Sequence, residues 1–197
     1  MNDMTAVMRH RSEFARAIRS HKFEITAAGV LFPEQHTFIG GAYDVEHRRG
    51  GDVIGRDLSP NIIVTEGLNH LWDALVHGGT QYTSWYVALF EANVTPGATL
   101  TAATFALTTT ECTAYDEATR VAYVEGAPSA GAIDNGASRA VFTMNASKTI
   151  YGGALLTASA KSATTGVLLG CAKFSASRAV LAADELSVKY SLSATSA

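Results

Sequence analysis

The clearest pattern of apolar and polar positions lies in residues 61–91, NIIVTEGLNHLWDALVHGGTQYTSWYVALFE. Three- and four-residue spacing of apolar positions predicts an amphipathic helix over about 66–77. Its apolar face comprises Leu68, Leu71, Trp72, Leu75 and Val76. Thr65 is the expected N-cap, and the double glycine after the helix is the expected left-handed end. The apolar run Trp85–Phe90 is typical of a strand covered on both faces. We therefore expect this to be the only substantial helix of the main domain, lying against a sheet.

The rest of the chain shows the two-residue alternation and the turn residues of β-structure. Two alternating runs around Gly50-Gly51 predict a hairpin over 42–58. The polar residues 92–105 are expected to form a long loop. The region after it predicts strands near 120–126, 130–134, 139–145, 149–158, 167–174 and 185–194. Together these predict a mainly β protein: an antiparallel β-sandwich with one packed α-helix and an N-terminal helical arm.

The N-terminal 40 residues differ in character from the remainder, so we divide the chain into a basic arm or extension, 1–40, and a β-sandwich domain, 41–197. Residues 1–22 can form an amphipathic helix with arginines opposite an apolar side. One interpretation is a docking arm; the other is a frayed terminus. On the first interpretation the candidate partner-binding residues are Arg9, Arg11, Phe14, Arg16, Ile18 and Arg19.

Charge also distinguishes the first 22 residues from the rest of the chain. The whole chain of 197 residues carries −3, and only 17% of its residues are charged, against about 25% in an average soluble domain. Residues 1–22 hold five basic and two acidic residues, +3, which leaves −6 for the remainder. A basic arm on an acidic body can dock on a neighbouring copy, an acidic partner or nucleic acid, and the overall charge argues against the last as the main partner. Sparse charge suggests a surface covered by neighbours or a Ser/Thr-rich one.

Few residues indicate a cofactor or metal. Cys112 and Cys171 match no metal or redox spacing, and Cys171 is expected to be a small buried apolar residue in a strand. His70, Asp73 and His77 share one side of the predicted helix, but their spacing favours a solvated polar face over a zinc site. We therefore predict no metal and no cofactor. No apolar run reaches the roughly 18 residues of a membrane span, and no secretory signal is evident, so we expect folding in a reducing cytoplasm.

The acidic groups do not form an obvious catalytic pair. Asp116 and Glu117 are adjacent and point apart, and Arg120 nearby favours a local salt link or turn cap. With Glu111 they are the only concentrated acidic group, and a hydrolase would need such carboxylates to converge in a cleft. Nucleophile-elbow, phosphate-loop and dinucleotide-binding motifs are missing from the sequence. We expect no catalytic residues and no enzyme activity.

Four segments together resemble a group of small structural proteins from tailed bacteriophages. They are 61–79 (NIIVTEGLNHLWDALVHGG), 84–90 (SWYVALF), 114–123 (AYDEATRVAY) and 140–153 (AVFTMNASKTIYGG), and the likeness covers roughly 41–197. The resemblance implies a virion component on the capsid surface or at the tail and its fibres. It would be made in the host bacterial cytoplasm, without a membrane role, and its partners would be capsid, portal, tail or fibre subunits and other copies of itself.

Repeated weak contacts can hold such a component firmly, and the basic arm is then expected to dock on a neighbouring subunit. The alternative function is a glycan- or receptor-binding module at a tail tip. Exposed aromatic residues clustered on the loops at one sandwich end would favour that alternative, but this sequence places most of its aromatic residues in predicted strands.

Overall fold

The structure is a computed structural model that describes residues 23–25, 31–33 and 37–196. The chain divides into two compact units, Met1–Phe38 with Thr195–Ala197, and Ile39–Ala194. In the first, β1 (Phe23–Ile25) and β2 (Leu31–Pro33) pair antiparallel. The predicted helical arm and all six candidate partner-binding residues fall within 1–22, outside the described residues.

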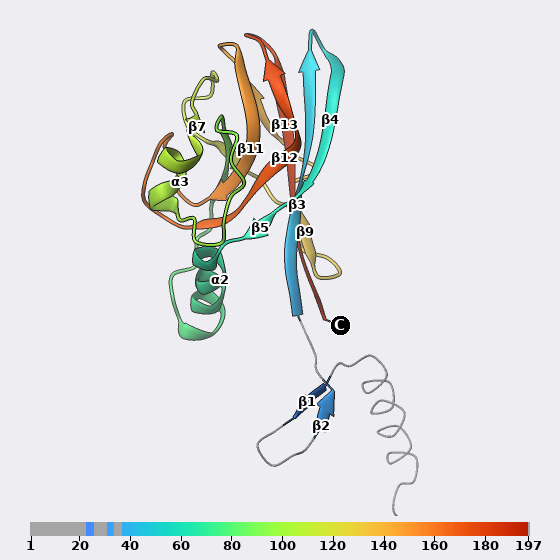
Figure 1. The fold of residues 1–197 in the computed structure, drawn as a ribbon, viewed down its shortest axis with the longest axis vertical. Coiled ribbons are helices and arrows are strands. Elements are labelled where there is room, and N and C mark those ends of the chain that lie inside the picture. Colours follow the sequence, from blue (N-terminus) through green and yellow to red (C-terminus); the bar gives the residue numbers. More distant parts are fainter. Residues whose placement is uncertain (1–22, 26–30, 34–36, 197) are drawn as a thin grey trace, which may run out of the picture. The chain divides into compact units, whose positions relative to one another are not determined.

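The second unit consists mainly of two antiparallel sheets (Figure 1). Sheet I has the order β10 (Ala140–Thr143), β13 (Glu185–Ser196), β3 (Thr37–Arg49), β4 (Asp52–Pro60), with β9 (Ala132–Asp134) also paired to β13. Sheet II has the order β5 (Ile62–Ile63), β12 (Leu168–Val180), β11 (Lys148–Leu156), β6 (Trp85–Phe90), β7 (Glu111–Cys112), with β8 (Val121–Tyr123) also paired to β6. The predicted mainly β, sandwich-like antiparallel fold is confirmed.

The β3–β4 hairpin turns at Gly50-Gly51, where the sequence predicts it. Gly50 and Gly51 take φ angles of 59° and 91°, which glycine adopts without a steric penalty. The two strands pair antiparallel, from Arg49 opposite Asp52 beside the turn to Ala42 opposite Pro60. β3 begins at Thr37, so it crosses the boundary between residues 40 and 41 that the sequence suggests.

The core between the sheets follows the two-residue alternation of the strands. Leu186, Val188 and Tyr190 on β13 stand two residues apart in the sequence, and all three are fully buried. They belong to one cluster with residues from sheet II, among them Leu89 and Leu155. All six strands expected in the C-terminal region are present, as β8 to β13.

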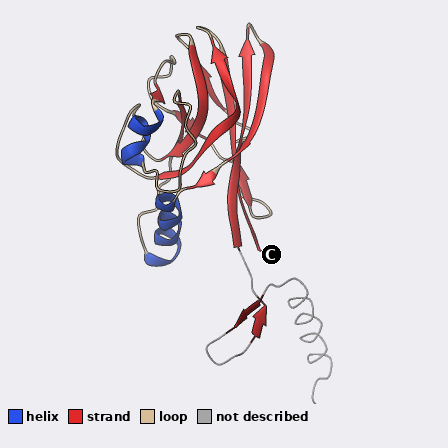
Figure 2. Cartoon of the chain, viewed as in Figure 1, coloured by secondary structure: helices blue, strands red, loops and turns tan. Residues whose placement is uncertain are grey.

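Sheet II is also covered on its outer face, and here the sequence-based expectation was wrong. A second helix, α3 (Ala102–Thr109), occupies part of the expected polar loop. Its fully buried Phe105 packs on Phe90 with a ring-centroid distance of 6.4 Å. This second cluster explains why β6 is apolar on both faces, as predicted. Both helices lie on the side of the unit away from the β3–β4 hairpin (Figure 2).

The first helix matches its predicted extent, and its apolar face is partly exposed. It consists of α2 (Thr65–Trp72) followed by a five-residue π-helical turn, η1 (Asp73–His77), and ends at Gly78 with a left-handed φ of 74°. Val64, not Thr65, occupies the N-cap position, and no side chain caps this end. Only the first half of the helix packs against the sheet: Leu75 and Val76 are 72% and 79% exposed. The helix lies against a sheet as expected, but only part of its apolar face is buried.

Candidate functional site

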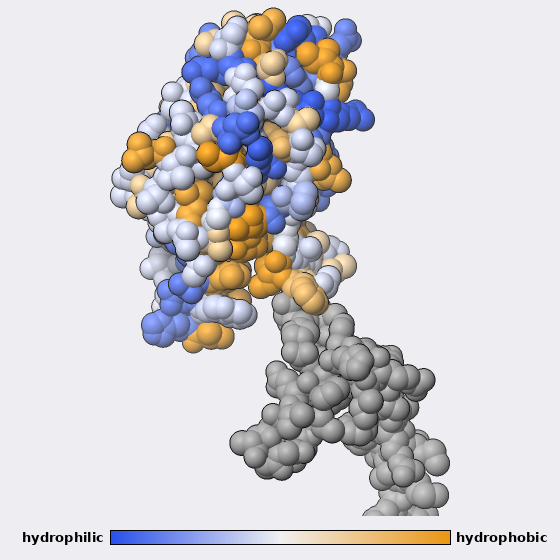
Figure 3. All heavy atoms as spheres, in the orientation of Figure 1, coloured by the Kyte–Doolittle hydropathy of each residue, from blue (hydrophilic) through white to orange (hydrophobic). Residues whose placement is uncertain are grey.

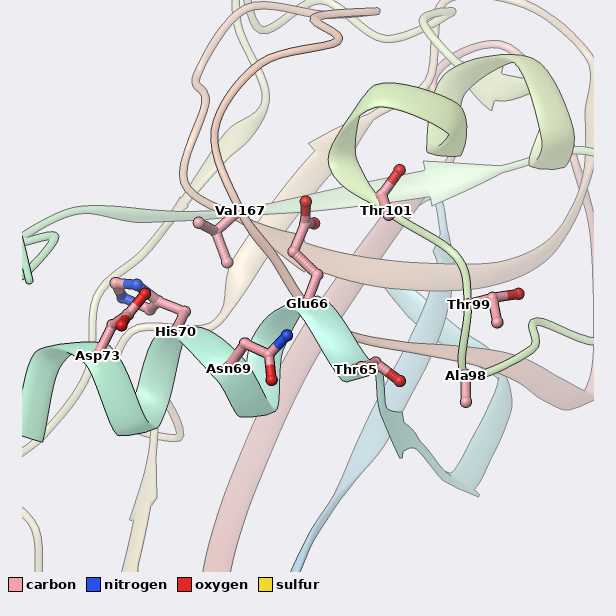
Figure 4. Close-up of a pocket in the computed structure, with 9 residues that line it drawn as sticks. All are labelled: Thr65, Glu66, Asn69, His70, Asp73, Ala98, Thr99, Thr101 and Val167. Atoms are coloured by element: carbon pink, nitrogen blue, oxygen red, sulfur yellow. The ribbon is translucent and has the colours of Figure 1, made fainter. Parts of the chain in front are cut away.

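The start of α2 borders a polar pocket of about 520 Å³ (Figure 4). Its lining consists of Thr65, Glu66, Asn69, His70, Asp73, Ala98, Thr99, Thr101 and Val167. Glu66 rises from α2 into the space between Thr101 and Val167. Oε2 of Glu66 accepts the amide of Ala102 at 2.8 Å and the amide of Leu168 at 2.7 Å. This carboxylate therefore joins the start of α3 to the start of β12, a structural role.

Two other residues of the segment 61–67 hold the start of the helix close to the sheets. A Cβ added to Gly67 would lie 2.3 Å from the carbonyl oxygen of Leu169, so only glycine permits the observed approach. Asn61 stands where the chain passes from sheet I to sheet II, and its Nδ2 donates to the Tyr190 hydroxyl at 2.8 Å. The distinctive residues of 61–67 thus build a junction.

The polar side chains farther along the helix do not converge on a ligand. Nδ1 of His77 and Oδ1 of Asp73 are 2.8 Å apart on an exposed surface. His70 instead packs on the rings of Tyr82 and Trp85, at centroid distances of 5.1 and 5.8 Å. Among the described residues no group of three His, Cys, Asp or Glu side chains is placed to hold a metal ion.

Arg120 pairs with an acidic residue other than the one expected. Its Nε and Nη2 donate to the two carboxylate oxygens of Glu111 at 2.8 and 2.6 Å, and both side chains are buried. Glu117 accepts the amide of Thr143 through both oxygens at 3.2 Å. The expected local salt link of Arg120 with Asp116 or Glu117 was wrong. Glu111 and Glu117 make structural contacts instead, the first with a buried arginine and the second with a backbone amide.

An exposed apolar surface lies on and beside the first helix. The helix exposes Trp72, Leu75 and Val76, which are 54%, 72% and 79% accessible, and we call these three residues the helix ridge. Next to it runs a groove of about 340 Å³, the helix groove, lined by Ile39, Leu71, Trp72, Leu75, Pro128, Gly131, Ala132, Ile133, Leu192, Ser193 and Ala194. Apolar surface gathers between α2 and β3 on the face shown in Figure 3. Contiguous exposed apolar surface of this kind marks interaction sites.

A second hollow opens from the same place into the end of the sandwich. This aromatic cleft, of about 410 Å³, is lined by Leu71, Gln81, Tyr82, Thr83, Trp85, Tyr123, Glu125, Ile133, Leu155, Leu169, Tyr190 and Leu192. It shares Leu71, Ile133 and Leu192 with the helix groove, so the two hollows adjoin, and together we call them the trench. Ligand sites are commonly concave and mostly apolar with a few polar groups, as here.

One polar group of the aromatic cleft is buried without a partner. The Tyr123 hydroxyl has no hydrogen bond, although the residue is only 7% exposed. Burial raises the pKa of Tyr123 well above its usual range, and the carboxylates of Glu125 and Asp134 raise it further. Asp134 is paired with Lys189 at 2.9 Å, whereas Glu125 has no ion pair within the described part of the chain. The polar end of the cleft is therefore negative.

Sequence reasoning pointed to other residues. The six predicted partner-binding residues lie outside the described residues. The trench is lined by residues of β3, α2, η1, the loop 78–84, β6, β8, β9, β11, β12 and β13. The available signal was Tyr82, an aromatic residue in a turn-rich segment just before the Trp85 strand. The described helices include none long and apolar enough to cross a membrane.

Comparison with protein-family models gives no match, and no curated protein is significantly similar to the chain. The resemblance to bacteriophage structural proteins therefore stays a prediction that rests on the sequence segments quoted above.

Proposed function

We propose that this protein is a structural virion component of a tailed bacteriophage, and that it assembles as a multimer at the tail and fibre region or on the capsid surface. The single observation that carries the proposal is the exposed helix ridge with its adjoining groove. Leu75 and Val76 are mostly uncovered within their own unit, at 72% and 79% exposure. Burying them against a neighbour would contribute about 1.5–3 kcal/mol for each side chain.

The packed sandwich supports the proposal as a suitable module for an assembly. Both faces of sheet II are covered and the Glu111–Arg120 pair is buried, so the unit that carries the ridge is well packed. A multimer of such units gains affinity from many contacts. The predictions of no enzyme activity, no cofactor and no nucleic-acid partner accompany the proposal.

Light scattering on the purified full-length chain tests the multimer. The wild type should form a defined multimer, and the double variant Leu75→Glu, Val76→Glu should be a monomer, since charge would have to be buried. Leu107→Glu on α3 is the matched control, because Leu107 is 89% exposed on the other helix. A wild type that is monomeric at every concentration, or a control that dissociates equally, would contradict the role of the ridge.

A second measurement tests the virion assignment. Gold-labelled antibodies against the protein should decorate particles of the encoding phage at the tail, the fibres or the capsid surface. Purified particles that lack the protein, while infected-cell lysates contain it, would overturn the assignment.

The alternative, a glycan- or receptor-binding module, is favoured by one observation. Tyr82 is 39% exposed in a loop at one sandwich end, close to Trp85 at a centroid distance of 6.4 Å. Exposed aromatic residues on end loops are the feature expected of such a module, and Tyr82 is one, beside a tryptophan of strand β6. Quenching of tryptophan emission by a saccharide, abolished in Tyr82→Ala, would support this alternative over a purely structural role.

A further inference from the structure

The trench at the sandwich end has two chemically different halves. The helix groove is lined almost entirely by apolar groups, from Ile39 on β3 to Leu75 on η1. The aromatic cleft has a floor of Leu155, Leu169 and Tyr190, and polar groups at its rim. A complementary ligand is therefore elongated, with a polar group at one end and apolar groups along the remainder.

The polar half favours a positive charge. The Glu125 carboxylate is exposed and has no ion pair among the described residues, and the Tyr123 hydroxyl nearby is buried without a partner. A buried hydroxyl without a hydrogen bond is uncommon, and a ligand that donates one to it would remove the cost. Since the rim also carries the carboxylate, a cationic donor satisfies both groups together.

Aromatic rings form the adjoining wall. Tyr82 and Trp85 are edge to face at 6.4 Å, and His70 packs against both. The negative faces of tyrosine and tryptophan rings attract guanidinium and ammonium groups, arginine most often. The wall, the rim carboxylate and the free hydroxyl thus point to one class of ligand, an arginine-bearing amphipathic segment.

We propose that this trench binds residues 1–22 of a second copy of the chain, with an arginine in the aromatic cleft and apolar side chains in the helix groove. Two properties of the sequence supply the complementarity. Residues 1–22 have five basic and two acidic residues, whereas residues 23–197 carry −6. Their apolar residues include Met4, Val7, Phe14 and Ile18, so one segment offers both kinds of contact.

The second copy follows from continuity with the helix ridge. Trp72 and Leu75 belong to the ridge and also line the groove, so a segment lying in the trench reaches the surface proposed for self-association. The inference rests on the proposed multimer and names the contact that forms it.

The chain contains two tryptophans, Trp72 and Trp85, and both line the trench, so intrinsic fluorescence reports its occupancy. The experiment adds a labelled synthetic peptide of residues 1–22 to the full-length protein and follows peptide anisotropy, tryptophan emission and mass by light scattering. We expect saturable binding, a change of tryptophan emission, and dissociation of the multimer as the peptide competes. Glu125→Gln should weaken binding about tenfold, the loss of one hydrogen bond to a charged group.

Control variants separate the outcomes. Glu185→Gln removes an exposed carboxylate of β13 that does not line the trench and should leave binding unchanged. A peptide with its four arginines replaced by glutamine should bind much more weakly. Equal binding of both peptides, or of the wild type and Glu125→Gln, would overturn the inference. A stable multimer that does not bind the peptide overturns the inference while the proposed function stands. Tryptophan quenching by a saccharide in a chain that leaves the peptide unbound overturns it in favour of glycan binding.

Discussion

Replacement of Arg120 by methionine is the sharpest test of how this fold is held together. Arg120 is fully buried and joins four acceptors: both carboxylate oxygens of Glu111, the carbonyl of Ala158 at 3.0 Å and the carbonyl of Ala163 at 3.2 Å. Methionine would fill much of the volume but donate nothing. Glu111 would keep only the amide of Ser162, at 3.1 Å, as a partner.

The expected cost follows from these contacts. Removing one member of a buried ion pair typically costs about 3–5 kcal/mol, because the other charge is left without compensation. The two orphaned carbonyls add to this, although such contributions are not additive. We expect the free energy of unfolding to fall by about 4 kcal/mol, a large part of the roughly 5–15 kcal/mol that holds a typical domain folded.

Urea unfolding followed by tryptophan fluorescence measures this loss as a shift of the midpoint. The double variant Arg120→Met, Glu111→Leu should be more stable than Arg120→Met alone, since it leaves no buried charge. His77→Ala is the control, because the His77–Asp73 pair is 84% and 56% exposed and should matter by less than about 0.5 kcal/mol. A single variant within about 1 kcal/mol of the wild type, or a double variant no better than the single, would refute the reasoning.

Three further predictions concern stability and reactivity. Gly67→Ala should lower the unfolding free energy by about 1–3 kcal/mol despite the better helix propensity of alanine, because the new Cβ meets a β12 carbonyl; calorimetry compares it with Gly97→Ala, where no atom lies within 4 Å. The Arg49 guanidinium holds the pKa of Asp184 below its usual value, so ionised Asp184 stabilises the folded chain above about pH 4 and this contribution is lost as the pH falls. Asp184→Asn should therefore flatten the acid side of a stability–pH profile. Burial raises the pKa of the Cys112 thiol to about 12, so a disulfide reagent at about pH 8 should label it only after unfolding.

The sequence predicted best the elements whose signals are local. Gly50-Gly51 fixes a hairpin through its own φ angles, and the alternation of β13 places Leu186, Val188 and Tyr190 on one face whatever packs there. The apolar run of β6 likewise predicted cover on both faces of sheet II. In each case a few neighbouring residues determine the conformation, so reading the chain in order is sufficient.

The missed features depend on residues far apart in the chain or on weak local preferences. α3 is rich in threonine, a poor helix former, and a capping box between Thr101 and Thr104 together with burial of Phe105 stabilises it. The trench brings together side chains from both sheets, the first helix and the loop 78–84. Its position depends on where α2 meets the sheets, which periodicity does not specify.

The junction at the start of α2 also explains why the helix ridge is exposed. Glu66 joins α3 to β12, and Gly67 lies against the backbone of Leu169, so the first turn of the helix is fixed beside the sheets. From that fixed point the helix runs past the packed region, and Leu75 and Val76 extend into solvent. A helix needed only to cover the sandwich would end near Trp72 or carry polar residues beyond it. The added turn contributes little to its own unit, and its apolar side chains become stabilising only when another surface covers them, which is the condition that assembly would supply.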